Sequence, residues 1–194
     1  MTSIALDFHE KYEETVPAEI VDGVFVRMDP ARTNHQYTMH NIWRILDRHL
    51  WGGKCRVLTD FFVHFDENNM FVPDLIVVCN PEIITKDGVF GTPDLVVEIL
   101  SPSTSKRDRG HKKSVYEKHG VKEYWIVDTK NRAVEVYTLR ENGFELSNVY
   151  YADFPKRELE RMSESERAAV THTFKSSLFD DLTIDALEIF EDLL

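Results

Sequence analysis

Hydrophobic and polar residues alternate through the middle of the chain as they do in β-strands. Residues 56–65 and 70–79 are rich in branched and aromatic side chains, and the polar tip Asp66-Glu67-Asn68-Asn69 separates them. This arrangement predicts a hairpin. The same signs predict four more strands, over 95–100, 123–128, 133–139 and 144–151.

Turn signals and helical spacing predict the remaining elements. Asp22-Gly23 lies between apolar residues and predicts a hairpin over 19–28. Apolar residues recur every three or four positions after Thr33 or Asn34, which we expect to cap a long helix that ends at Gly52-Gly53. Further helices are predicted over 105–119, where Gly120 ends the helix, and over 4–14, 158–170 and 184–193.

Length and composition favour one domain. With 194 residues and 42% hydrophobic content, the chain can bury a sizeable core, and we expect a single α/β or α+β domain over 1–194. No apolar stretch approaches the roughly 18 residues that cross a bilayer, so we expect no membrane association. Cys55 and Cys79 are too few and too far apart for a disulfide framework or a zinc finger, which favours a reducing cytoplasm.

The alternation on the predicted strands and the spacing on the predicted helix direct three charged side chains inward. Strand alternation places Glu98 on the same face as Val96, and Asp74 on the same face as Ile76. Lys112 begins the inward stripe of the helix over 105–119. An unpaired buried carboxylate costs several kcal/mol, so these acids need a shared cation or a metal ion. The alternative is a structural ion pair between Glu98 and a lysine at the helix edge.

Several short runs carry a family resemblance. They are Pro73-Asp74-Leu-Ile-Val-Val, Pro93-Asp94-Leu-Val-Val-Glu98-Ile-Leu-Ser-Pro-Ser-Thr104, the spaced Asp108, Lys112 and Tyr116, and Gly120-Val-Lys-Glu-Tyr-Trp-Ile-Val-Asp128. Together they resemble the Uma2 (DUF820) family of the PD-(D/E)XK restriction-endonuclease-like superfamily. The resemblance implies an α/β (α+β) restriction-endonuclease-like fold, with a central mixed β-sheet flanked by helices and a divalent-metal site on the sheet.

The resemblance also implies roles for individual residues. Asp74 and Glu98 match the metal-binding acids, and Glu19 matches a catalytic acid from a helical or near-helical N-terminal segment. Lys112 matches a catalytic lysine displaced from the strand to the helix, since Leu100 stands where the plain motif has lysine. Asp94 lies about 13 Å from Glu98 along one strand, too far to share an ion with it, so we expect Asp94 at a strand start.

Carboxylates are the ligands that Mg²⁺ or Mn²⁺ prefers, and such an ion can activate water for attack on a phosphodiester. Lys106 and Arg107, at the start of the helix over 105–119, are candidate phosphate contacts, although such a run of basic residues is usually just a solvated helix face. His35 matches a family position beside the site, with a capping or core role as the alternative.

The formal charge of −11 predicts weak, salt-sensitive binding to DNA, and a homodimer or a protein partner would then assist. Two functions remain. The first is a metal-dependent endonuclease that hydrolyses DNA. The alternative is a binding or assembly module that keeps the fold without turnover.

Overall fold

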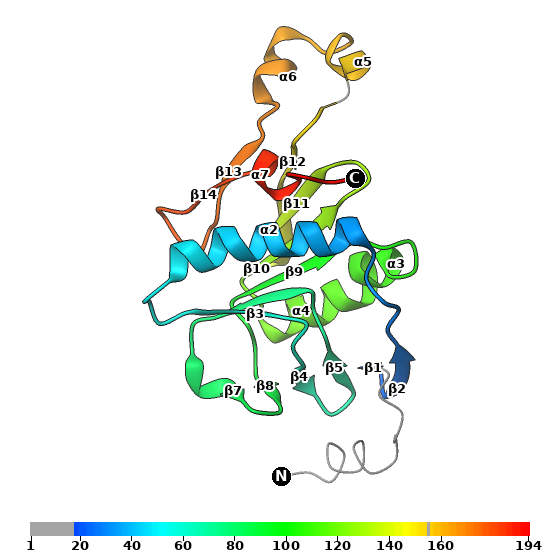
Figure 1. Cartoon of the computed structure of the whole chain (residues 1–194), viewed down its shortest axis with the longest axis vertical. Helices are drawn as coiled ribbons and strands as arrows, with labels where there is room; N and C mark the ends of the chain where they lie inside the picture. Colours follow the sequence, from blue (N-terminus) through cyan, green and yellow to red (C-terminus); the bar gives the residue numbers. More distant parts are fainter. Residues whose placement is uncertain (1–17, 155) are drawn as a thin grey trace.

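A mixed six-stranded sheet forms the centre of the protein (Figure 1). The structure, a computed structural model, describes residues 18–154 and 156–194, so the helix predicted over 4–14 lies outside the described residues. Strands β9 and β10 run parallel, and the other pairs of this sheet are antiparallel. In spatial order the strands are β12 (Gly143–Tyr151), β11 (Ala133–Arg140), β10 (Glu123–Asp128), β9 (Leu95–Ile99), β6 (Leu75–Val78) and β3 (Arg56–Thr59).

A second six-stranded sheet packs against one face of the central sheet. Its strands are β2 (Val24–Arg27), β1 (Ala18–Val21), β5 (Asn69–Phe71), β4 (Val63–Asp66), β8 (Gly88–Phe90) and β7 (Ile84–Thr85), with the short helix η1 (Pro81–Ile83) before β7. The predicted hairpin turn at Asp22-Gly23 is confirmed, and both turn residues have positive φ, 49° and 78°. Phe71 of this sheet shares a buried cluster with Ile76 and Val96 of the central sheet.

The predicted hairpin over 56–79 has the expected connection but crosses from one sheet to the other. Each long strand is broken, so that β3 and β6 pair in the central sheet while β4 and β5 pair in the second sheet. Asp60, at the first break, has a positive φ of 48°. Pro73, at the second break, has no N–H to donate to a ladder. The breaks leave Asp74 immediately before the first residue of β6.

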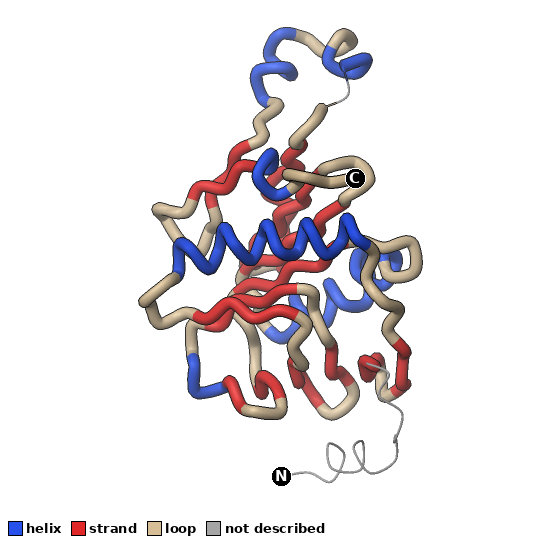
Figure 2. The backbone as a smooth tube through the Cα atoms, viewed as in Figure 1, coloured by secondary structure: helices blue, strands red, loops and turns tan. Residues whose placement is uncertain are grey.

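Helix α2 (Thr33–Leu50) covers the other face of the central sheet (Figure 2). Its buried side chains, among them Ile42 and Leu46, pack on Leu75, Val97 and other residues of the sheet. Arg32 occupies the N-cap position and no side chain caps the helix, so the predicted caps Thr33 and Asn34 were wrong. None of the helices in the described part of the chain combines the length and apolar character needed to cross a bilayer.

The helix predicted over 105–119 contains an irregular turn. It consists of α3 (Ser105–Arg107), a π-helical turn η2 (Asp108–Lys112) and α4 (Lys113–His119). Gly120 ends it in the left-handed conformation with φ 84°, as the sequence predicts. Val115 and Tyr116 face the cluster between the two sheets, so this helix covers the same face of the central sheet as the second sheet.

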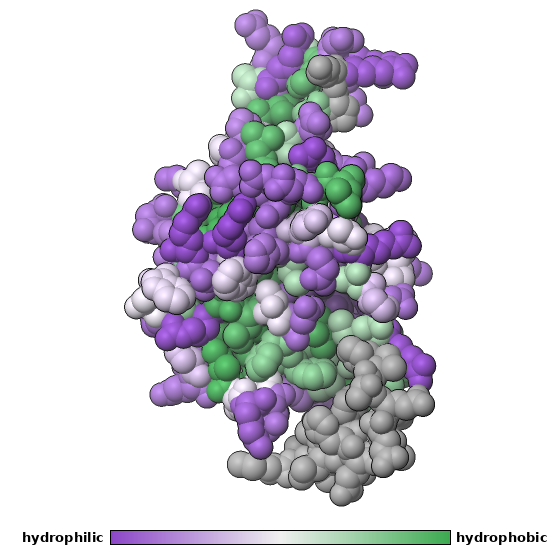
Figure 3. All heavy atoms as spheres, viewed as in Figure 1, coloured by the Kyte–Doolittle hydropathy of each residue, from purple (hydrophilic) through white to green (hydrophobic). Residues whose placement is uncertain are grey.

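The C-terminal part of the chain differs from its prediction. The charged segment forms two short helices, α5 (Lys156–Leu159) and α6 (Glu164–Ala169), instead of one. They project away from the body, and the face of the protein in Figure 3 is mostly hydrophilic over them and over α2. The helix predicted over 184–193 is replaced by β14 (Thr183–Asp185), which pairs with β13 (Thr173–Lys175), and by α7 (Ala186–Ile189).

Cys55 and Cys79 form a disulfide bond, so the expectation that they are too far apart in the sequence for disulfide bonding was wrong. They are 24 residues apart in sequence, but Arg56 pairs with Val78, and the two cysteines are the next residues outward across β3 and β6. The pairing of β3 with β6 thus brings the two distant cysteines together. The argument for a reducing cytoplasm loses the support that it took from these two residues.

Candidate active site

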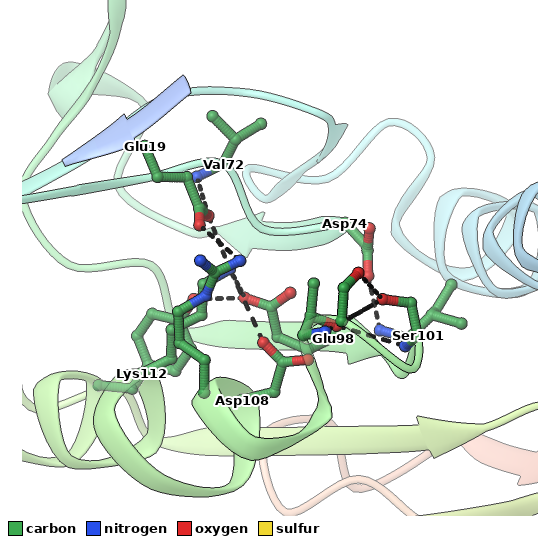
Figure 4. A network of polar contacts seen from close by, with 12 residues as sticks. Glu19, Val72, Asp74, Glu98, Ser101, Asp108 and Lys112 are labelled. Carbon is green, nitrogen blue, oxygen red and sulfur yellow. Dashed lines mark hydrogen bonds and ion pairs between the residues drawn. The ribbon is translucent and has the colours of Figure 1, made fainter. Parts of the chain in front are cut away.

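Lys112 lies at the centre of a buried group of acids between the two sheets (Figure 4). Its ammonium Nζ is 2.7 Å from Glu19 Oε1, 2.9 Å from Glu98 Oε1 and 4.0 Å from Asp108 Oδ1. The side chain is only 3% exposed, so Lys112 does not lie at the helix edge. Burial opposes the charge, but Glu98, Glu19 and Asp108 outweigh it and raise the pKa of Lys112.

Lys112 and Asp108 reach this position from one helical turn. They are four residues apart and so lie on one face of the helix, and both side chains are buried in the π-helical turn η2. Tyr124 donates a hydrogen bond from its hydroxyl to the backbone oxygen of Asp108, at 3.1 Å. The turn is therefore attached to the central sheet, with its two buried charged residues, Asp108 and Lys112, beside Glu98.

Glu98 is 4% exposed and its two oxygens have different surroundings. Oε1 accepts hydrogen bonds from Lys112 Nζ at 2.9 Å and from the Tyr116 hydroxyl at 2.6 Å. Among the residues that the structure describes, none donates a hydrogen bond to Oε2. Burial raises the pKa of Glu98, against the opposing effect of Lys112. One oxygen is held by the protein and the other is left for a ligand.

Glu19 comes from strand β1, which corrects the expected helical or near-helical position. The break in the strand after Phe71 frees the N–H of Val72, which donates to Glu19 Oε1 at 3.0 Å. Arg107 approaches the other oxygen, with Nη2 at 3.4 Å from Oε2. The strand break and the helix together hold Glu19 against Lys112.

Asp74 lies beside Glu98 at the end of the neighbouring strand. Leu75 pairs with Val97, and the N–H of Ile99 donates to Asp74 Oδ2 at 2.6 Å. His35, at the start of α2, is 3.1 Å from Asp74 Oδ1 through Nε2. Burial opposes protonation of His35, but the hydrogen bond and the charge of Asp74 raise its pKa. In Figure 4, Asp74 lies on the opposite side of Glu98 from Lys112.

Asp94 has the strand-start position that the sequence predicts. It directly precedes β9. Its Oδ2 accepts the N–H of Cys79 at 2.7 Å, and its Oδ1 accepts a hydrogen bond from Lys122 at 2.6 Å. Asp94 therefore lies at the far end of the strand from Glu98, whereas Asp74 lies beside Glu98, and this position favours Asp74 as the acid that completes the site.

Sequence reasoning did not assign a site role to Asp108 or Tyr116. Asp108 is 1% exposed and neither of its carboxylate oxygens has a hydrogen-bond partner among the described residues. Burial raises the pKa of this carboxyl, against the opposing effect of Lys112. Helical spacing already places both residues on the inward face of the helix with Lys112. Spacing alone does not show whether an inward residue only packs in the core or belongs to a functional site.

Residues 5–168 match the Uma2 family, whose description is "Putative restriction endonuclease". This chain belongs to the Uma2 family. The match spans most of the chain and confirms the resemblance that the sequence runs indicate. The "Uncharacterized protein slr1290" of Synechocystis is 29% identical over 128 residues, which are 64% of this chain and 67% of that protein.

A solved structure supports the fold. The crystal structure described as a "putative nuclease belonging to DUF820", from Anabaena variabilis, has a TM-score of 0.70 and covers 96% of each chain at 18% identity. At that identity the likeness shows the fold alone. The predicted restriction-endonuclease-like architecture, a central mixed sheet flanked by helices, is thereby confirmed for this Uma2 chain.

The donor set of this Uma2 site suits one kind of metal ion. Within residues 18–154 and 156–194 no group of three or more His, Cys, Asp or Glu side chains is placed to enclose a metal. Mg²⁺ does not need such a cage, because one or two carboxylates, water and a substrate phosphate commonly hold it. Glu98 Oε2 and the carboxylate of Asp74 are hard oxygen donors of that kind. The residues present therefore fit Mg²⁺ or Mn²⁺.

Several basic residues at the start of the helix over 105–119 are engaged within the protein. Arg109 forms an ion pair with Glu135, and the Lys113 ammonium lies 3.7 Å from the ring centroid of Tyr137. Lys106 is exposed. Of the basic side chains predicted to contact phosphate, Lys106 is thus the accessible one, since Arg107 is directed toward Glu19.

Proposed function

We propose that this Uma2 protein is an Mg²⁺- or Mn²⁺-dependent endonuclease that hydrolyses phosphodiester bonds of DNA at Asp74, Glu98 and Lys112, with Glu19 as a further catalytic acid. The observation that carries the proposal is the difference in hydrogen bonding between the two carboxylate oxygens of Glu98. Lys112 and Tyr116 occupy Oε1, while Oε2 accepts no hydrogen bond from the described residues. Oε2 is thus the oxygen of this largely buried carboxylate that remains able to bind a ligand.

The ion, held by Asp74 and Glu98, would supply an activated water and neutralise charge on the phosphate. Lys112 is a donor in this scheme and not a base, because the surrounding acids raise its pKa. It orients water or a phosphate oxygen through the charged ammonium. Tyr116 stays a neutral hydroxyl, since burial and the charge of Glu98 raise its pKa well above the usual range, and it holds Glu98 in place.

DNA contacts rest on few side chains. We assign phosphate binding to Lys106 and to the part of the Arg107 side chain that stays exposed beside Glu19. We assign His35 to the frame of the site, where it fixes the orientation of Asp74. A net charge of −11 opposes a polyanion, so the complex should be weak and should weaken further as salt rises. A second copy of the chain or a protein partner would supply further basic side chains, of which this chain exposes few near the site.

One observation favours the second function, a binding or assembly module without turnover. Arg109 and Lys113 are engaged within the protein, and the chain as a whole is acidic. Such a module would keep the fold, and its Lys112 would serve only as the counter-ion of Glu98 and Glu19.

Cleavage of supercoiled plasmid and of single-stranded DNA at low salt separates the two functions. The endonuclease nicks DNA with Mg²⁺ or Mn²⁺ but not with EDTA, and its rate falls steeply between about 50 and 200 mM salt. Glu98→Ala should lower the rate at least about a hundredfold. Nicking that persists in Glu98→Ala comes from a contaminant, and no nicking by the unmodified protein supports the binding module.

A further inference from the structure

The ammonium of Lys112 occupies the middle of three buried acids, and the third acid is not bonded to it. Glu19 and Glu98 each accept a hydrogen bond from Lys112, whereas Asp108 Oδ1 lies 4.0 Å away. Both oxygens of Asp108 are buried and form no hydrogen bond of good geometry with the residues described here, although the Thr104 hydroxyl is near enough to oppose the rise in the Asp108 pKa. An unpartnered carboxylate in this place is costly to the folded protein, so it calls for a partner in another state of the site.

A divalent cation at Glu98 changes the balance of charge around Lys112. In the structure described, Glu98 shares its negative charge with the lysine alone, at 2.9 Å. A cation on the same carboxylate repels the ammonium and competes with it for Glu98. The lysine then needs another acceptor within reach, since a buried ammonium also needs its hydrogen bonds.

We propose that Asp108 is a positioning residue, which receives the ammonium of Lys112 when a divalent cation binds to Glu98. This inference rests on the proposed function, because it assumes the cation at Asp74 and Glu98. A displacement of Nζ by about 1 Å brings it within hydrogen-bond distance of Asp108. Glu19 remains bonded to the lysine throughout. The pair Glu19 and Asp108 thus keeps Lys112 in the site, while Glu98 is released to the ion.

Arg107 and Tyr116 fit this arrangement. Arg107 lies 3.4 Å from Glu19 Oε2 and holds that carboxylate in place, so Glu19 does not follow the lysine. Tyr116 donates to Glu98 Oε1 at 2.6 Å, and this oxygen keeps a hydrogen bond when Lys112 leaves. Only the lysine is required to move.

The test is a double-mutant cycle on Mn²⁺ affinity, measured by calorimetry without DNA. The unmodified protein, Asp108→Asn, Lys112→Met and the double variant are compared. If Asp108 acts through Lys112, Asp108→Asn weakens Mn²⁺ binding about tenfold when the lysine is present and less than about twofold when it is absent. Asp94→Asn is the matched control, because it removes an acid from the other end of the Glu98 strand and should leave the affinity unchanged.

The outcomes separate this inference from the proposed function. Equal weakening by Asp108→Asn in both backgrounds means a through-space charge effect and overturns the inference alone. Absence of Mn²⁺ binding, or unchanged binding in Asp74→Ala, overturns the proposed metal site and the inference with it.

A second measurement applies where Lys112→Met fails to fold. Lysine side chains labelled with ¹³C and ¹⁵N are followed by NMR during Mg²⁺ titration, with the Lys112 signal identified by its loss in Lys112→Arg. The signal should shift in the unmodified protein and shift differently in Asp108→Asn. Identical shifts in the two proteins overturn the inference.

Discussion

Two buried glutamates on neighbouring parallel strands have opposite characters. Glu98, on β9, faces the second sheet and is surrounded by Lys112, two further acids and a tyrosine. Glu123, on β10, shares its face with Trp125 on the side of the central sheet that α2 covers. Glu123 is 0% exposed and Glu98 is 4% exposed, so burial alone does not distinguish them.

Their partners do distinguish them. Glu123 Oε1 accepts the indole N–H of Trp125 at 2.7 Å, and Oε2 accepts the N–H of Ser177 at 2.6 Å and the Ser177 hydroxyl. Neutral donors thus engage both oxygens, and no cation pairs with Glu123 in the described part of the chain. The arrangement ties the C-terminal segment to the sheet. Between these two glutamates, the one with an oxygen left over lies at the candidate site, and the one with both oxygens engaged joins two parts of the fold.

The largest effect on stability is expected at Glu123. Glu123→Ala leaves the buried Trp125 indole N–H without an acceptor and removes the hydrogen bonds from Ser177, and should lower the free energy of unfolding by about 3 kcal/mol. Urea unfolding followed by tryptophan fluorescence measures it. Glu123→Gln is the milder control, because its amide oxygen still accepts one donor. A loss below about 1 kcal/mol for Glu123→Ala would show that this carboxylate is not structural.

The opposite sign is expected at Asp108, beside Glu98. Its carboxyl pKa is raised by burial above the ordinary 3.8, so the folded protein binds a proton more readily than the unfolded chain, and stability falls as pH rises from 3.8 through the folded-state value. Asp108→Asn imitates the neutral acid. It should be more stable than the unmodified protein by about 1 kcal/mol at pH 7.

Thermal unfolding of both proteins between pH 4 and 7.5 measures this difference. It should shrink toward zero near pH 4, because the native acid then takes up its proton. A variant that is less stable at pH 7 would place Asp108 with Glu123 among the structural acids.

Much of the fold is predictable from local signals. Asp22-Gly23, the helical spacing between Met39 and Leu50, and Gly120 identify turns, a helix and a helix end that the structure confirms. The contact between Lys112 and Glu98 is also confirmed, since alternation on a strand and spacing on a helix both direct side chains inward. These signals are local in sequence, so they can be read before any tertiary contact is known.

The features that the sequence did not predict depend on contacts between distant segments. The division of the 56–79 hairpin between two sheets, the strand position of Glu19 and the Cys55–Cys79 disulfide follow from sheet packing. Regular spacing does not reveal a π-helical turn either. The sequence therefore identifies Asp74, Glu98 and Lys112 as a group, but not the unpartnered carboxylate of Asp108 beside them.

The distinction between the two glutamates is tested most directly by Mn²⁺ calorimetry on three proteins. The unmodified protein and Glu123→Gln should bind Mn²⁺ with similar affinity, because Glu123 has no free oxygen and faces away from the site. Glu98→Gln should bind at least about tenfold more weakly, since it loses the charged oxygen that we assign to the ion. Equal binding by Glu98→Gln and the unmodified protein would contradict the account.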